Sequence, residues 1–409
     1  MPAESRSADR PRVHFVVQPT VSHYRGPLLR RLLESRRLEF DLVGRFRNSE
    51  GASADRIESA DASVLAEVTP MDFVSCGELW WEKGQVGAVL SGRHDVYVLA
   101  GRIYTLSAWA ALLAARARGA RVLLWGHGWK RPESGMKRRL RLAFYALSDG
   151  LLVYGDRARE LGTAYGVDAE KIAVVYNSIY SADQLEAADA DVPRSSGASR
   201  AEEGRREPTG DERPTLIYSS RLTTRHRLDT LVEALEQLPE EVVRPRVIVV
   251  GDGVERPRLE RRFAAAGLEA DFLGAVYDVD RLRALYAAAD AAVCIGGAGL
   301  NVTQALGFGV PVVAEDAHPD SSPEIEAVVD GETGRLYRSG DPASLQEVLA
   351  EMLADPEGMR RMGAAGRAVV EERYTAEAHA EALEDAILGF LRRWDRRGRR
   401  RRSVKPATS

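Results

Sequence analysis

The chain has 409 residues, of which 44% are hydrophobic and 29% are charged, and its formal net charge is −4. This length allows two domains with full cores, and the composition is that of a globular protein. The slightly acidic balance argues against a general nucleic-acid binder, because such proteins carry a basic surplus.

The number of cysteines and the hydropathy of the chain indicate the cellular compartment of the protein. Cys76 and Cys294 are too few and too far apart for a disulfide framework or a metal knuckle. The first ten residues are polar, so no secretory signal is visible, and no run reaches the roughly 18 to 20 apolar residues of a membrane span. These features predict a cytoplasmic protein in a reducing environment.

Short aliphatic or β-branched runs alternate with longer helical patterns in the first half. The predicted strands are Val13–Val17, Asp41–Val43, Val96–Ala100, Val122–Trp125, Gly150–Tyr154 and Ile172–Val175. The predicted helices are Gly26–Glu34, Leu106–Ala117, Gly135–Ser148 and Arg157–Tyr165. This alternation indicates βαβ units and a parallel sheet, whereas residues 44–90 show no clear pattern.

A polar segment follows, and the alternation then restarts. The predicted strands of the second half are Thr215–Tyr218, Arg246–Val250, Asp271–Leu273, Ala291–Ile295 and Val310–Ala314. Its predicted helices are Leu228–Leu238, Arg256–Ala266, Val279–Ala288 and Asn301–Leu306, with a long helical pattern over Pro356–Trp394 that breaks near Tyr374–Thr375. The sequence therefore predicts a second parallel α/β sheet.

These patterns divide the chain into six parts. We expect a disordered N-terminus (1–11), an N-terminal Rossmann-like domain (12–186), a polar linker (187–213), a C-terminal domain (214–374), a C-terminal helix (375–394) and a basic tail (395–409). Open α/β sheets bind ligands at the carboxyl ends of their strands, so a ligand is expected at those edges.

Four segments of the second half occur in a fixed order. SSRLTTRHRLDTLVEALEQL (Ser219–Leu238) puts arginines after a strand, and VIVVGDGVERPRLE (Val247–Glu260) is a strand, a Gly-Asp-Gly turn and a helix. GGAGLNVTQALGFGVPVVAED (Gly296–Asp316) and SPEIEAVVDGETGRLY (Ser322–Tyr337) follow. In this order the segments resemble the donor-binding half of family 4 glycosyltransferases, which have the two-domain GT-B fold.

The resemblance extends to the first half in weaker form. It is carried by QPTVSHYRGPLLRRL (Gln18–Leu32), WGHGW (Trp125–Trp129) and VVYNSI (Val174–Ile179). It implies two Rossmann-like domains facing a cleft, with the C-terminal helix crossing back to the N-terminal domain. It also implies transfer from a nucleotide-diphosphate sugar without an essential metal or other cofactor.

The resemblance assigns phosphate binding to arginines. Arg221 matches the family's arginine after the first strand of the donor domain, where a guanidinium pairs with two phosphate oxygens. Where relatives have a lysine, this chain has His226, flanked by Arg225 and Arg227. A neutral histidine lacks the full charge, so we expect one of the two arginines, and more so Arg227, to supply it.

The Gly-rich stretch departs from the family's E-x7-E pattern, whose first glutamate binds the donor sugar and whose second binds the ribose. The matching positions hold Gly296 and Gln304; the glutamine can still bond a ribose diol, but the glycine cannot replace a carboxylate. Further donor-binding candidates share the Gly-rich stretch or neighbouring turns: Gly297, Gly299, Leu300, Asn301, Gly251 and Glu324. Glu324 could reach the donor or simply cap a helix.

Candidates in the first half lie after strands. His127, between two glycines, matches the family's histidine that faces the donor sugar, and we expect it near the reacting groups rather than as a general base. Gln18, His23 and Tyr24 follow the first strand as acceptor-side candidates, although His23 and Tyr24 might equally be buried loop anchors.

The resemblance predicts a retaining glycosyltransferase that acts on a glycan, lipid-linked or small-molecule hydroxyl acceptor. The alternative is a catalytically impaired GT-B protein that binds nucleotide or glycan or supports a partner transferase. A sugar-nucleotide epimerase or a dehydrogenase is the third interpretation, and the lack of a G-x-G-x-x-G motif after the first strand argues against the dehydrogenase.

Two basic segments suggest a further expectation, which is peripheral contact with the inner face of an anionic membrane. They are the arginine-rich run of Arg392–Arg402, which includes Trp394, and the amphipathic segment Lys130–Leu147. Both could instead be solvated surfaces.

Overall fold

The computed structural model describes residues 10–18, 20–46, 59–190 and 213–403. It divides into two units, one formed by residues 1–176 with 377–409 and the other by residues 177–376. The boundary thus lies between Tyr176 and Asn177, earlier than the predicted end of the first domain. Most of the predicted linker, the predicted disordered N-terminus up to residue 9, and the last residues of the predicted tail lie outside the described residues.

The first unit contains a parallel sheet with the strand order β3-β2-β1-β6-β7-β8-β9. Its strands are β1 (Arg12–Val16), β2 (Glu39–Gly44), β3 (Thr69–Pro70), β6 (Val96–Ala100), β7 (Val122–Gly126), β8 (Gly150–Val153) and β9 (Ile172–Val174). A separate antiparallel hairpin, β4 (Phe73–Cys76) with β5 (Leu79–Glu82), occupies part of the segment that showed no clear pattern.

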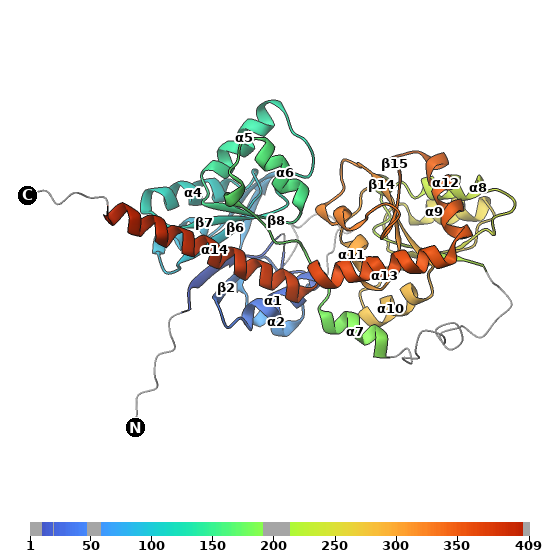
Figure 1. The fold of residues 1–409 in the computed structure, drawn as a ribbon, viewed down its shortest axis with the longest axis horizontal. Coiled ribbons are helices and arrows are strands. Elements are labelled where there is room, and N and C mark those ends of the chain that lie inside the picture. Colours follow the sequence, from blue (N-terminus) through green and yellow to red (C-terminus); the bar gives the residue numbers. More distant parts are fainter. Residues whose placement is uncertain (1–9, 19, 47–58, 191–212, 404–409) are drawn as a thin grey trace, which may run out of the picture. The chain divides into compact units, whose positions relative to one another are not determined.

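Helices cover both faces of this sheet (Figure 1). They are α1 (Gly26–Leu33), α2 (Ala62–Ala66), α3 (Gln85–Ser91), α4 (Leu106–Arg118), α5 (Gly135–Ala146), α6 (Asp156–Ala164) and α14 (Ala376–Ser403), with the 3-10 turns η1 (His23–Arg25) and η2 (Ala169–Lys171). One core packs α1, α2 and α14 against the sheet, and the other packs α3 to α6. Alternating side chains of each buried strand supply the two cores.

Helix α14 belongs to the first unit although it ends the chain. Leu383, Ile387 and Phe390 join the core formed by β1, β7 and β8, and Phe390 lies where a side chain at Gly150 would clash. The predicted break is confirmed, because α13 ends at Arg373 and α14 begins at Ala376. The predicted tail is wrong at its start, since α14 continues to Ser403.

The second unit has a parallel sheet with the order β12-β11-β10-β13-β14-β15. Its strands are β10 (Thr215–Ser219), β11 (Arg246–Val250), β12 (Ala270–Gly274), β13 (Ala291–Cys294), β14 (Val312–Asp316) and β15 (Gly334–Arg338). Its helices are α7 (Ala182–Ala190), α8 (Asp229–Glu236), α9 (Arg256–Ala265), α10 (Val279–Ala287), α11 (Leu300–Gly307), α12 (Pro342–Ala354) and α13 (Pro356–Arg373), with η3 (Thr224–His226) and η4 (Pro323–Ala327).

Side chains from α8, α9 and α12 pack on one face of the second sheet. The two units therefore share one architecture, a parallel sheet between helices, and both predicted Rossmann-like domains are confirmed. In the second unit the sequence prediction missed β15, α12 and α7. Helix α7 occupies the first residues of the predicted linker, where alanines favour a helix over a loop.

Candidate donor site and the edge of the first sheet

The carboxyl edge of the second sheet has a switch point at β10, which lies between β11 and β13. The chain leaves β10 toward one side and β13 lies on the other, so the loops after these strands diverge and leave room for a ligand. The arginine segment follows β10, the Gly-Asp-Gly turn follows β11, and the Gly-rich loop follows β13. Three of the four predicted motifs thus meet at one edge.

Glycines let the turn after β11 pack against the segment after β10. A Cβ at Gly251 would lie 1.9 Å from the carbonyl oxygen of Ser220, and one at Gly253 would lie 2.2 Å from that of Leu222. The Leu222 N–H donates to the Asp252 carbonyl at 2.9 Å. Gly251 is therefore required for backbone packing beside Arg221.

The arginine segment also packs directly on the Gly-rich loop. Gly296 has φ +77°, and a Cβ there would lie 2.4 Å from the Cα of His226. Arg225 donates from Nε to the Gly296 carbonyl at 3.2 Å, and its Nη2 lies 3.1 Å from the Cβ position of Gly297. The structure therefore places a guanidinium over the two glycines.

Glu315, near the end of β14, accepts hydrogen bonds from both the arginine segment and the Gly-rich loop. This residue was not predicted from the sequence. Its side chain is 1% exposed, and it accepts from Arg227 at 2.9 Å, from the Gly296 N–H at 2.8 Å and from the Gly340 N–H at 3.0 Å. Arg227 therefore already has an anionic partner within the protein, although its side chain is 44% exposed, and its contact with a phosphate stays a prediction.

His226 carries no charge near neutral pH. Burial, the nearby guanidinium groups of Arg225 and Arg221, and His318 lower the pKa of His226 to about 4. Its Nδ1 lies 2.7 Å from the hydroxyl of Thr223. This agrees with the prediction that arginines rather than His226 supply positive charge at this edge.

Helix α11 begins immediately after the Gly-rich loop, with Gly299 as its N-cap residue. The Gly299 N–H donates to the Asn301 side chain at 2.8 Å, so that amide and that side chain bind each other. First-turn N–H groups have no intrahelical acceptor, which leaves the amides of Leu300 and Asn301 as candidates for an anion.

Gln304 lies in a buried network on α11 rather than at an open surface. Its Oε1 accepts from Ser219 and from Tyr286, each at 3.2 Å, and its Nε2 donates to the Tyr180 hydroxyl at 2.6 Å. The residue is 7% exposed. These three groups use the hydrogen-bonding capacity of its carbonyl oxygen and one of its N–H groups, and the contact with a ribose diol stays a prediction.

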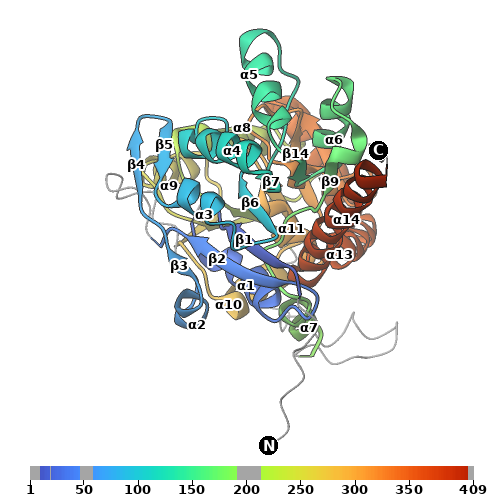
Figure 2. The same ribbon diagram turned by 90° about the vertical axis from the view of Figure 1, so that its left-hand side faces the viewer.

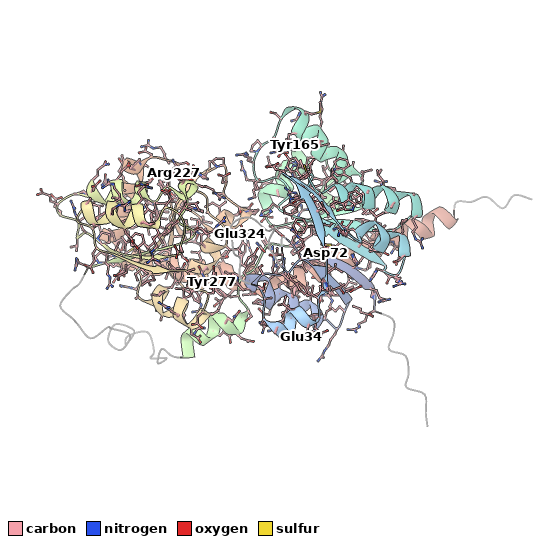
Figure 3. All side chains as sticks on the ribbon, turned by 180° about the vertical axis from the view of Figure 1, so that it is seen from behind. Glu34, Asp72, Tyr165, Arg227, Tyr277 and Glu324 are labelled. Carbon is pink, nitrogen blue, oxygen red and sulfur yellow. The ribbon has the colours of Figure 1, made fainter. Side chains whose placement is uncertain are left out.

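Glu324, in η4, is a buried carboxylate of the second unit (Figure 3). Its Oε1 accepts from the Asn177 side chain at 2.5 Å, and its Oε2 has no hydrogen-bond partner in the described part of the chain. The Ser322 N–H, just before η4, donates to the Ala298 carbonyl at 2.7 Å. Glu324 thus follows a segment that is bonded to the Gly-rich loop.

The carboxyl edge of the first sheet places His127 beside a buried arginine. His127 follows β7, and its ring stacks edge-on against Tyr154 at 5.0 Å between centroids. Arg25 is 3% exposed and donates to the Tyr154 hydroxyl at 3.2 Å, with its guanidinium 4.9 Å from the Trp125 ring centre. Arg25 was missed because arginines are usually exposed, although it directly follows the candidates His23 and Tyr24.

The acceptor-side candidates lie around this arginine. The Gln18 carbonyl accepts from the Arg25 Nε at 3.1 Å, and the Gln18 Nε2 is buried without a partner within the described ranges. His23 and Tyr24 are half-buried and stack edge-on at 5.5 Å. These residues share the loop after β1, where the first sheet has its own switch point between β1 and β6.

Comparisons with known proteins agree with this geometry. Residues 199–369 match the family model "Glycosyl transferases group 1". The GDP-mannose-dependent alpha-(1-6)-phosphatidylinositol monomannoside mannosyltransferase of Mycobacterium tuberculosis is 32% identical over 213 residues, 49% of this chain and 54% of that protein. The D-inositol 3-phosphate glycosyltransferase of Xylanimonas cellulosilytica is 28% identical over 77% of this chain and 71% of that protein. The chain spans about half the length of the mycobacterial relative.

Among solved structures, Anabaena HepE in complex with UDP is similar with a TM-score of 0.63 and 16% identity, covering 92% of this chain and 99% of that one. This likeness, with the two Rossmann-like units, shows the GT-B fold. Among the described residues, no helix combines the length and apolar character that a membrane crossing requires.

Proposed function

We propose that the protein is a glycosyltransferase that moves a sugar from a nucleoside diphosphate to a hydroxyl group of an acceptor. The observation that carries the proposal is the packing of the Arg221–Arg227 segment directly on the Gly-rich loop, at the switch point of the second sheet. Guanidinium groups, close backbone and a helix N-terminus together form a site for a diphosphate.

In the proposed reaction the bond between the sugar's anomeric carbon and the phosphate oxygen breaks, and a bond to the acceptor oxygen forms on the same face. The leaving diphosphate takes the acceptor's proton. Arg221 and Arg225 stabilise the charge that develops on the diphosphate, and Leu300 and Asn301 donate their amides to it. These groups provide positive charge without a metal ion, so we expect none to be essential.

We infer that GDP-mannose is the first donor to test, because the mycobacterial relative is named for it; the relatives' names also support lipid-linked or inositol-type acceptors. We matched Gly296 and Gln304 to the two glutamates of the family's E-x7-E pattern, and we propose that Glu324 takes over a sugar hydroxyl. Its Oε2 is a buried acceptor without a partner in the described ranges, and η4 follows a segment that is bonded to the Gly-rich loop.

Isothermal titration with GDP, UDP and dTDP tests the donor site. We expect one diphosphate to bind, and Arg225→Gln to weaken it about 10- to 100-fold, because a charge-assisted hydrogen bond contributes roughly 1.5 to 3 kcal/mol. Arg281→Gln on exposed α10 is the matched control and should bind as the wild type does. Failure of all three nucleotides at millimolar concentration would overturn the proposal.

The alternative is a GT-B protein that binds nucleotide without transfer. It is motivated by Gly296, which stands where the resemblance predicts the first, sugar-binding glutamate. Donor hydrolysis separates the two. An active transferase releases GDP or UDP slowly from its sugar donor even without an acceptor, whereas a binding protein leaves every donor intact.

We also propose that α5 makes the peripheral membrane contact. Met136 and Leu140 are 74% and 43% exposed, and Lys137, Arg138 and Arg139 lie beside them. Trp394 is less suitable, because it stacks on Phe390 and lies under Arg121. In sedimentation with anionic vesicles, Met136→Ser combined with Leu140→Ser should reduce binding, while Val243→Ser, at an exposed residue of the second unit, should not.

A further inference from the structure

Two histidines and an aspartate meet at the amino end of the first sheet, opposite the edge that carries His127. His14 lies within β1, and Asp41 is its register partner on β2. His94 lies two residues before β6, the strand on the other side of β1. Figure 2 shows β1, β2 and β6 as neighbours, so two strands and the segment that leads into the third bring one side chain each to the same place.

The three side chains are close enough to share one ligand. One ligand atom from each lies within 4.8 Å of the other two, and the His94 Nε2 lies 3.0 Å from the Asp41 Oδ2. The ring centres of His14 and His94 are 5.2 Å apart. No other group of three such side chains within this distance occurs in the described part of the chain.

The histidines are buried and incompletely bonded. His14 is 6% exposed, and the side chain of His94 is 7% exposed. The Nδ1 atoms of both rings have no hydrogen-bond partner among the described residues. A buried nitrogen without a partner is costly, and two such rings grouped with one carboxylate point to a missing group that would accept a lone pair from each ring.

We propose that His14, Asp41 and His94 bind a first-row transition-metal ion, with Zn²⁺ as the ion that suits this ligand set best. Two imidazoles and a carboxylate are nitrogen and oxygen ligands of the kind that Zn²⁺ takes, with water completing the coordination. Bonds of about 2.0 to 2.2 Å put two ligand atoms about 3.4 Å apart in a tetrahedral site, so a pair separated by up to 4.8 Å must close by at most about 1.4 Å. The side chain of Asp41, 44% exposed, has room for that movement.

The proposed ion is structural. It lies at the edge of the first sheet opposite the edge that carries His127. It would link β1, β2 and the start of β6 through ligands that are up to 80 positions apart in the chain. Metal binding should therefore stabilise the first unit without taking part in sugar transfer. The inference does not depend on the proposed function.

Titration of untagged, chelator-treated full-length protein with ZnCl₂ tests the proposal, with Co²⁺ as a spectroscopic probe of nitrogen coordination. We expect one equivalent to bind, and thermal stability to rise with zinc concentration by mass action. Asp41→Asn and His94→Gln should each weaken zinc affinity about tenfold or more. Glu39→Gln is the control, because Glu39 is an exposed carboxylate two residues earlier on the same strand and should bind as the wild type does.

The variants must be shown to be folded by circular dichroism before titration, and Asp41→Asn guards against misfolding because Asp41 is half-exposed. Retained affinity in either ligand variant would overturn the proposal. Equal loss in Glu39→Gln would also overturn it, since it would indicate a diffuse acidic surface. Absence of zinc binding in the wild type would likewise overturn it, and the contact between His94 and Asp41 would then be an ordinary hydrogen bond.

Discussion

Both sheets have a switch point at their carboxyl edge, but the arginines there are placed in opposite ways. In the second unit the Arg225 side chain is 47% exposed and lies over glycines, whereas in the first unit Arg25 is 3% exposed among aromatic rings. An exposed guanidinium can exchange water for a ligand's phosphate at low cost. A buried one acts on the protein's own groups, here the Gln18 carbonyl and the Tyr154 hydroxyl.

The second edge also contains a buried anion that sets its geometry. Glu315 binds Arg227 and the Gly296 N–H together, so the Gly-rich loop and the arginine segment are fixed before a ligand arrives. Such preorganisation favours binding, because less ordering is left to the ligand. The comparison predicts that the stability of the second edge depends on close backbone packing and on a buried ion pair. The stability of the first edge should depend on a buried cation.

The largest expected effect is that of Gly296→Glu, which introduces a glutamate at the position that we matched to the first glutamate of the E-x7-E pattern. The new Cβ would lie 2.4 Å from the His226 Cα and 2.6 Å from the Arg225 carbonyl oxygen, at φ +77°. We expect the free energy of unfolding to fall by roughly 4 kcal/mol or more, which lowers the melting temperature by about 10 °C. Nucleotide binding should be lost as well. Scanning calorimetry and titration with GDP measure both.

Gly331→Glu is the control for that variant. Gly331 has φ +78°, and a Cβ there would meet nothing within 4 Å. It therefore shows the cost of backbone strain alone, about 1 to 2 kcal/mol. Restored or improved transfer by Gly296→Glu would contradict the packing described for this edge.

The second effect in size is that of Glu315→Gln. The substitution keeps the shape of the side chain but removes the negative charge that pairs with Arg227. Because the Glu315 side chain is only 1% exposed, we expect a loss of about 3 kcal/mol in the free energy of unfolding. Urea denaturation measures it. Glu351→Gln removes the charge of a side chain that is 63% exposed and paired with Arg335, and should change stability by less than about 1 kcal/mol. Equal effects would show that burial of Glu315 does not matter.

Much of the fold could be predicted from local patterns, whereas side-chain environments could not. Buried parallel strands such as Val96–Ala100 and Val247–Val250 are runs of apolar, mostly aliphatic residues, which a sequence shows directly. The bonds of Gln304 involve Tyr180 and Tyr286, 124 and 18 positions away, and no local pattern encodes them. The same holds for Glu315, which in sequence is one acid of an exposed-looking pair with Asp316.

The cation of the first unit should matter less to stability than Glu315 does. Arg25→Met fills a similar volume but removes the guanidinium that donates to the Gln18 carbonyl and to the Tyr154 hydroxyl. We therefore expect the free energy of unfolding to fall by about 1 to 2 kcal/mol. Hydrogen exchange should show faster opening of β1 and β8 while the second unit stays as protected as in the wild type. Arg30→Met, at a side chain 52% exposed on α1, the helix that follows Arg25, should have little effect.

The smallest expected effect is a pH dependence that His226 gives to the second unit. Burial and the guanidinium groups of Arg225 and Arg221 lower its pKa from 6.5 to about 4 in the folded protein, so the unfolded chain binds the proton more readily. Stability from this group is therefore complete above pH 6.5 and is lost as the pH falls toward 4. Between pH ~7.5 and ~5.5 the loss should be about 1 kcal/mol. His226→Asn retains a group that can bond Thr223 and does not titrate, so its unfolding free energy should change less over this range. A slope equal to that of the wild type would mean that the arginines do not act on this histidine, and the contrast between the two edges would lose its electrostatic basis.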